Sequence, residues 1–107
     1  MPKYLIQTAY TAESWMAMSK NPQDRLEAVR PSIEGLGGKL DVGYLTFGEY
    51  DLVAIVDFPD NISVASFSIS VASKGGVKAF TTTPLMTMDE AVEAMEKAGG
   101  SKYAPPK

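Results

Sequence analysis

The stretch Tyr50–Phe58, with the sequence YDLVAIVDF, predicts a strand at the centre of a β-sheet. Alternate positions place five apolar side chains on one face: Tyr50, Leu52, Ala54, Val56 and Phe58. Val53 and Ile55 occupy the middle of the other face. Leaving apolar surface in water costs about 25 cal/mol per Å². We therefore expect both faces of this strand to be covered.

Three further strands are predicted from the same kind of pattern. Leu40–Phe47 alternates and forms a hairpin with Tyr50–Phe58 through a turn at Gly48–Glu49. Lys3–Tyr10 alternates as a mostly buried strand does. Val77–Met86 is rich in threonine, and the proline near its end indicates an edge position. Together these segments predict a four-stranded sheet.

Two helical segments are predicted between the first and second strands. Thr11 provides a hydroxyl cap for a short helix over Ala12–Lys20. A second helix is expected to begin with Asn21 as its cap and Pro22 at its first position, because both residues favour helix starts. Pro31 lies inside this helix, where we expect a kink. Apolar residues follow at helical spacing at Leu26, Val29, Ile33 and Leu36.

The segment Ile62–Lys74 fits two interpretations. Phe67, Ile69 and Val71 alternate with serines, as in a half-buried strand. A helix accounts for more of the segment, because the serines at positions 63, 66, 70 and 73 fall on one side of it. Asp60 can cap its start. We therefore expect a helix.

A last helix is predicted after the fourth strand. Thr87 and Glu90 form a capping box at its start, and Glu93 and Lys97 stand one turn apart as an ion pair. Its apolar stripe consists of Met88, Ala91, Val92, Met95 and Ala98. We expect residues 1–100 to form a single domain and residues 101–107 to form a flexible tail.

The predicted order βαββαβ, followed by a helix, indicates an α+β domain of ferredoxin-like type. In this fold a four-stranded antiparallel sheet carries its helices on one face, and the first and third strands are central. The helices therefore leave Val53 and Ile55 without cover on the other face. The sheet of a second copy is the expected cover. The sequence thus predicts a homodimer, or a higher even oligomer, that associates through its sheet.

The composition argues against several classes of site and partner. The chain contains neither histidine nor cysteine, so the usual zinc, haem and thiolate chemistries lack their residues. Its formal net charge is -3 and it has no run of lysine or arginine, so nucleic-acid binding is not expected. No apolar run approaches the roughly 20 residues that span a bilayer. We expect a cytoplasmic protein that binds no membrane, cofactor or metal ion.

Five residues are candidates for a ligand site: Tyr10, Trp15, Arg25, Tyr50 and Asp51. Their aromatic side chains, together with that of Tyr44, could line a flat pocket between sheet and helices. Asp51 stands at the start of a core strand and is the one candidate for a general base, with Arg25 as its ion-pair partner. The alternatives are structural. The aromatic side chains would then be core residues, and Asp51 would accept backbone N–H bonds and fix the hairpin.

The sequence around the central strand resembles the GYD-domain family. The resemblance rests on FGEYDLVAIVDFPDN at Phe47–Asn61, with LGGKL before it and KGGVKAFTTT after it. The Gly-x-Tyr-Asp signature of that family is met here by Gly48, Tyr50 and Asp51. The resemblance implies a dimeric α+β barrel, in which two ferredoxin-like protomers pack sheet on sheet. Relatives in this superfamily include cofactor-independent monooxygenases, haem-degrading enzymes, lactone isomerases and ligand-sensing modules, so the fold does not specify an activity.

Two functions of different classes remain open. The first is a homodimer that binds a small molecule, including an enzyme that acts without a cofactor on a planar or carbonyl-containing substrate. The alternative is a non-enzymatic regulatory or structural assembly module. A cavity of a few hundred Å³ holding Asp51 or Tyr50 would favour the first. A filled core would favour the alternative.

Overall fold

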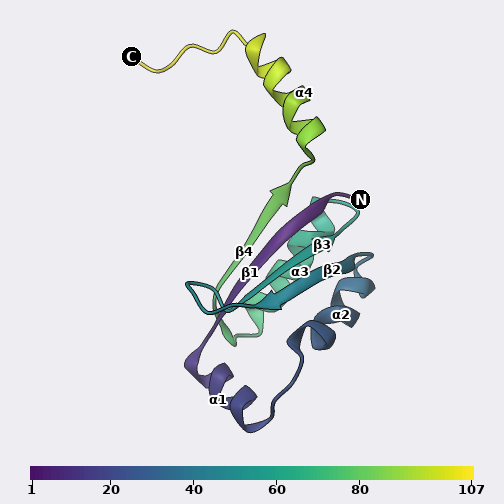
Figure 1. Cartoon of the computed structure of the whole chain (residues 1–107), viewed down its shortest axis with the longest axis vertical. Coiled ribbons are helices and arrows are strands. Elements are labelled where there is room, and N and C mark those ends of the chain that lie inside the picture. Colours follow the sequence, from purple (N-terminus) through teal and green to yellow (C-terminus); the bar gives the residue numbers. More distant parts are fainter.

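The computed structural model describes the whole chain, residues 1–107. Figure 1 shows a body built around one sheet, with a helix that extends away from it near the C-terminus. The elements follow in the order β1 (Lys3–Tyr10), α1 (Ala12–Lys20), α2 (Arg25–Gly35), β2 (Lys39–Leu45), β3 (Leu52–Asp57), α3 (Asn61–Ser73), β4 (Val77–Leu85) and α4 (Met88–Gly99).

The sheet has the strand order β2-β3-β1-β4, and all neighbouring strands are antiparallel. The first and third strands are therefore central, and β4 lies at an edge, as predicted. The α+β ferredoxin-like fold is confirmed. Opposite residues in the register share a face of the sheet, so Ile6 and Ala54 face one side while Leu5 and Ile55 face the other.

The core lies between the sheet and helices α2 and α3. The strands contribute Ile6, Val56 and other alternate residues to it, and the helices contribute Ile33 and Phe67. Phe58, just after β3, is fully buried, and its ring lies 5.8 Å from that of Phe67. The even positions of β1 and β3 thus meet the helices, as their alternation predicts.

The segment that fitted both a strand and a helix is helix α3. The Asp60 carboxylate caps it by accepting a hydrogen bond from the backbone N–H of Ser63 at 2.8 Å. The capping box predicted for α4 is also present, since Thr87 and Glu90 each bond the other's backbone N–H. The capping residues therefore predict the starts of both helices correctly from the sequence.

Two predicted boundaries were wrong. Helix α2 begins at Arg25 rather than Pro22, because the Asp24 carboxylate accepts the N–H groups of Leu26 and Glu27 and so provides the cap. The predicted two-residue turn at Gly48–Glu49 is instead a loop over residues 46–51. This loop is closed by a bond from the Thr46 N–H to the Asp51 carbonyl at 2.7 Å.

Helix α4 projects from the end of β4 and lies beyond the body of the molecule (Figure 1). The radius of gyration is 17.0 Å, compared with about 13 Å for a compact domain of 100 residues. Three side chains of the apolar stripe are largely exposed: Met88 at 75%, Val92 at 49% and Met95 at 66%. We call residues 86–99 the α4 arm. No helix of the chain is both long and apolar enough to cross a bilayer.

The face of the sheet opposite α2 and α3 carries a second apolar surface. We call it the open face; its central side chains, Leu5, Val53 and Ile55, are only partly buried. Val42 and Tyr44 of β2 lie opposite Ile55 and Val53 and are more exposed, Tyr44 at 66%. The prediction that the helices cover only one face is confirmed.

Candidate functional site

Asp51 anchors the loop before β3 to the end of β1. Its Oδ2 atom accepts hydrogen bonds from the backbone N–H of Tyr10 at 2.8 Å and from the indole Nε1–H of Trp15 at 3.3 Å. Its own N–H donates to the carbonyl of Thr8 at 2.8 Å. The rings of Tyr10 and Trp15 meet edge to face, with centroids 5.6 Å apart. Asp51 therefore joins the loop, β1 and α1 at one point.

The expected ion pair between Arg25 and Asp51 was wrong. Arg25 instead donates a hydrogen bond from its guanidinium to Oε1 of Gln23 at 2.8 Å and forms no ion pair. Asp51 does not need this partner, because its carboxylate is already hydrogen-bonded by Tyr10 and Trp15. Arg25 begins α2, and this start is placed by the neighbouring Asp24 cap.

A cavity of about 390 Å³ lies between α2 and α3 on the covered side of the sheet. Most of its lining is apolar and includes Ile6 and Val56 of the strands. Of the five predicted ligand residues, Tyr10 and Arg25 line it. Asp51, Trp15 and Tyr50 do not. Asp51 and Trp15 contact Tyr10, whereas the Tyr50 carbonyl accepts a hydrogen bond from the Thr46 hydroxyl within the loop.

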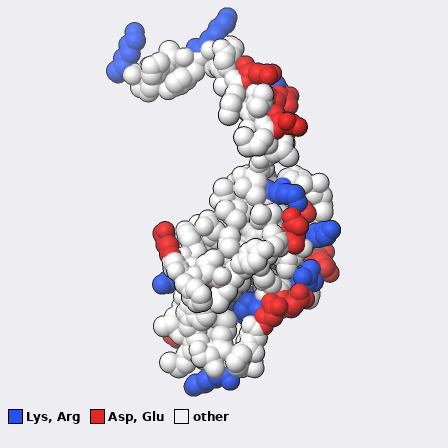
Figure 2. Space-filling view, viewed as in Figure 1, with Lys and Arg blue, Asp and Glu red and all other residues white.

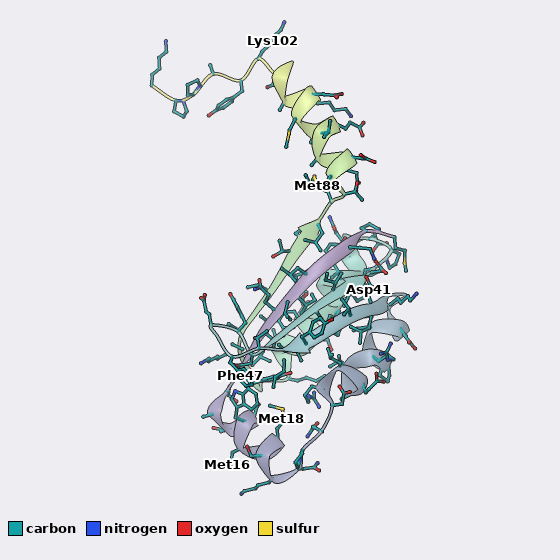
Figure 3. The ribbon with its side chains drawn as sticks, viewed as in Figure 1. Met16, Met18, Asp41, Phe47, Met88 and Lys102 are labelled. Atoms are coloured by element: carbon teal, nitrogen blue, oxygen red, sulfur yellow. The ribbon has the colours of Figure 1, made fainter.

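Three further lining residues were not predicted to contact a ligand. Lys74 caps the C-terminal end of α3, Thr8 belongs to β1, and Met18 of α1 lies in the space between α1 and α2 (Figure 3). Thr8 could have been identified from the sequence, because it is the one non-aromatic polar residue at the core-facing positions of β1. Lys74 could not have been identified in this way, because a lysine before two glycines is common at the end of a helix.

Burial raises the pKa of the Tyr10 phenol above its usual value, and the nearby Arg25 guanidinium partly opposes this by lowering the pKa. The charge of Asp51 raises the pKa further. Tyr10 and Arg25 are therefore electrostatically coupled at the wall of the cavity.

This coupling makes a testable prediction. Arg25→Gln removes the cation that stabilises the phenolate, so the pKa of Tyr10 is expected to move further upward. The tyrosinate absorbance of wild type and variants, each compared with its own Tyr10→Phe partner, isolates this titration. Arg30→Gln is the matched control, because Arg30 lies on the same helix but pairs with Glu27. An unchanged Tyr10 titration in Arg25→Gln would contradict the coupling.

Comparison with known proteins identifies the family. The sequence matches the GYD domain over residues 4–95. A protein of Thermus thermophilus, named glutamine synthetase and cystathionine beta-lyase binding protein, is 29% identical over 90 residues, which are 83% of this chain and 94% of that protein. The crystal structure of FFRP-DM1 superposes with a TM-score of 0.55 at 17% identity, covering 80% of this chain and all of that one, and this shows the shared fold alone. Because the domain match spans most of the sequence, the chain belongs to the GYD-domain family.

Proposed function

We propose that this chain is a non-enzymatic regulatory module that binds metabolic enzymes and works as a homodimer. The observation that carries the proposal is the α4 arm, whose apolar stripe is exposed and has no cover within the chain. Support also comes from the Thermus thermophilus relative, which is named for binding two enzymes. A projecting amphipathic helix is a common means of binding another protein.

The spacing of the stripe suits a helix that docks into an apolar groove. Met88, Ala91, Val92 and Met95 stand at positions i, i+3, i+4 and i+7, which are the anchor positions of helix-in-groove recognition. Methionine has a flexible, polarisable side chain and adapts to grooves of different shape. The partner we propose for the arm is therefore an enzyme with an apolar groove on its surface.

The charges on the polar side of the arm indicate a second property of the partner enzyme. This side of the arm carries four carboxylates: Asp89, Glu90, Glu93 and Glu96. Figure 2 shows acidic side chains in red along one side of this helix. Only one cation, Lys97, lies among them, and it stands near Glu93 at 3.6 Å. Opposite charges at the rim of an interface favour encounter and orientation. The groove of the partner is expected to have a basic rim.

The open face of the sheet serves self-association in this proposal. Its central apolar side chains, Leu5, Val53 and Ile55, lie on the two central strands, and Val42 and Tyr44 extend the surface onto β2. A second copy presents the same surface, so the two faces can pack around a two-fold axis. Each dimer would then display two α4 arms, which increases avidity for an enzyme with several subunits.

Direct binding to purified enzymes tests the proposal. We expect the chain to bind purified glutamine synthetase or cystathionine beta-lyase in biolayer interferometry, with binding reduced at least about 10-fold by Val92→Glu, because a carboxylate would enter the apolar groove. Ala94→Glu is the matched control, because it adds the same charge one turn after Glu90, about 160° around the helix from Val92. If neither enzyme binds, or if Val92→Glu binds as the wild type does, the proposal is wrong.

A second candidate function rests on a separate observation, the cavity between α2 and α3. Its volume of about 390 Å³ is in the usual range for small-molecule sites, and its walls combine apolar side chains with a few polar groups. We propose that it holds a small organic ligand, which could accompany enzyme binding. Asp51 does not reach the cavity wall, so general-base catalysis by Asp51 at this site receives no support from the geometry.

A further inference from the structure

The charged residues that line the cavity are all of one sign. Arg25 and Lys74 are its only ionisable lining residues apart from Tyr10, and neither aspartate nor glutamate lines it. Neither cation forms an ion pair with any residue of the chain. The protein as a whole is acidic, with a formal net charge of -3, so this local excess of positive charge is not a reflection of its composition.

Both cations lie at the same end of the cavity. Lys74 ends α3, and the chain turns through Gly75 and Gly76 to Val77, which pairs with Tyr10 on β1. The guanidinium of Arg25 lies near enough to the Tyr10 phenol to lower its pKa. Arg25 therefore lies beside Tyr10, and Lys74, which is exposed, stands three residues before the strand position that pairs with Tyr10.

Most of the remaining lining is apolar, with Thr8 as the polar residue that the sheet contributes. The floor consists of side chains from the sheet, among them Ile6, Ala54 and Val56, and the sides include Val29 and Phe67 of the two helices. Small residues keep space between the helices, because Ala28 and Ser32 on α2 and Ser70 on α3 also line the cavity. The cavity is only partly enclosed, so a small molecule can enter it from solvent.

We propose that the cavity binds an amphipathic monocarboxylate, whose carboxylate lies between Arg25 and Lys74 and whose apolar body lies on the sheet. This inference rests on the second candidate function, the binding of a small molecule in this cavity. A guanidinium can hold a carboxylate with two parallel hydrogen bonds, and the ammonium group of Lys74 adds a second charge. The phenol of Tyr10 can donate one more hydrogen bond at the same end.

The size and polarity of the cavity limit the ligand further. A volume of about 390 Å³ is at the small end of the range for ligand sites, about 300 to 1,000 Å³. A nucleotide would bring several negative charges, for which only two cations are present. A carboxylate with one aromatic ring or a short branched chain satisfies both limits.

Calorimetric titration of the full chain with phenylacetate and with phenylacetamide tests the inference. The two probes have nearly the same shape and differ in charge, so they separate recognition of the anion from filling of the cavity. We expect phenylacetate to bind at least about 10-fold more tightly, because hydrogen bonds to a charged group are stronger than neutral ones. Arg25→Gln and Lys74→Gln should each reduce this preference, because each weakens phenylacetate binding more than phenylacetamide binding.

Matched variants keep the result interpretable. Arg30→Gln and Lys78→Gln remove one positive charge each at residues outside the cavity lining and should leave the preference intact. Ser70→Leu fills the cavity and should weaken both probes. If the two probes bind equally, or if Arg25→Gln and Lys74→Gln keep the full preference, the anion inference is wrong while a small-molecule cavity still stands. If neither probe binds, the inference and the second candidate function are both wrong, and enzyme binding through the α4 arm is unaffected.

Discussion

Replacing Val53 by glutamate is expected to convert the proposed homodimer into monomers that keep their fold. Val53 lies in the middle of the open face, opposite Gln7 and Tyr44 on the neighbouring strands. In a two-fold dimer each copy would bring one carboxylate into the interface. Burying a polar group without a partner costs about 1–3 kcal/mol. The two carboxylates together cost at least about 2 kcal/mol, which raises the dissociation constant of the dimer by about 30-fold or more.

Native mass spectrometry and sedimentation equilibrium, at the same protein concentration for each variant, measure this change. Ile62→Glu is the matched control, because Ile62 is also an exposed apolar residue, at 80%, but it lies in the first turn of α3, on the other side of the sheet. A negative charge at a helix N-terminus is favourable, so this control should fold and remain a dimer. A monomeric wild type, or a Val53→Glu protein that is still dimeric, would contradict association through the open face.

The fold was predictable because its signals are local and agree with one another. The alternation of Tyr50–Phe58 and the other strands identified the sheet, and the side-chain caps at Asp60 and Thr87 marked the starts of α3 and α4. The start of α2 was missed because two signals compete there. Asn21 and Pro22 resemble a helix start, but Asn21 ends α1 and Asp24 caps α2. Sequence pattern alone does not show which carboxylate or amide side chain reaches the free N–H groups.

The site was only partly predictable, because it depends on contacts between distant segments. Tyr10 and Arg25 were chosen for their residue types, and both line the cavity. The expected pairing of Arg25 with Asp51 assumed that the two side chains lie close together in space. Their spacing in the sequence does not determine that distance. Lys74 comes to the same end of the cavity through the pairing of Val77 with Tyr10, so its place follows from strand register. The cavity itself results from small side chains on two helices. Sequence periodicity shows which side of a helix is buried but does not show whether its side chains fill the space.

The position of the α4 arm could not be read from its sequence either. Its capping box, apolar stripe and Glu93–Lys97 pair were all predicted and are all present. Those features determine that a helix forms and which side of it is apolar. They do not determine which surface covers that side. The side chains of Met88, Val92 and Met95 are exposed in the chain, which leaves them available to bind a partner.

Replacing Asp51 by alanine is expected to lower the free energy of unfolding by about 2–4 kcal/mol. The change removes the acceptor for the Tyr10 N–H and for the Trp15 indole, and a hydrogen bond to a charged group contributes about 1.5–3 kcal/mol. The bond to the indole is the longer one, at 3.3 Å, and should contribute less. Urea denaturation measures the loss. Asp51→Asn keeps an acceptor without the charge and should lose less.

The control for Asp51 lies in the same loop. Glu49→Ala removes an exposed carboxylate that makes no hydrogen bond or ion pair, so its effect should stay within about 0.5 kcal/mol. Trp15→Phe removes only the indole donor and should fall between the two. If Asp51→Ala unfolds at the same urea concentration as the wild type, Asp51 does not hold the loop to β1. The aspartate of the Gly48-x-Tyr50-Asp51 signature would then need another role, and an enzymatic one would be the next to test.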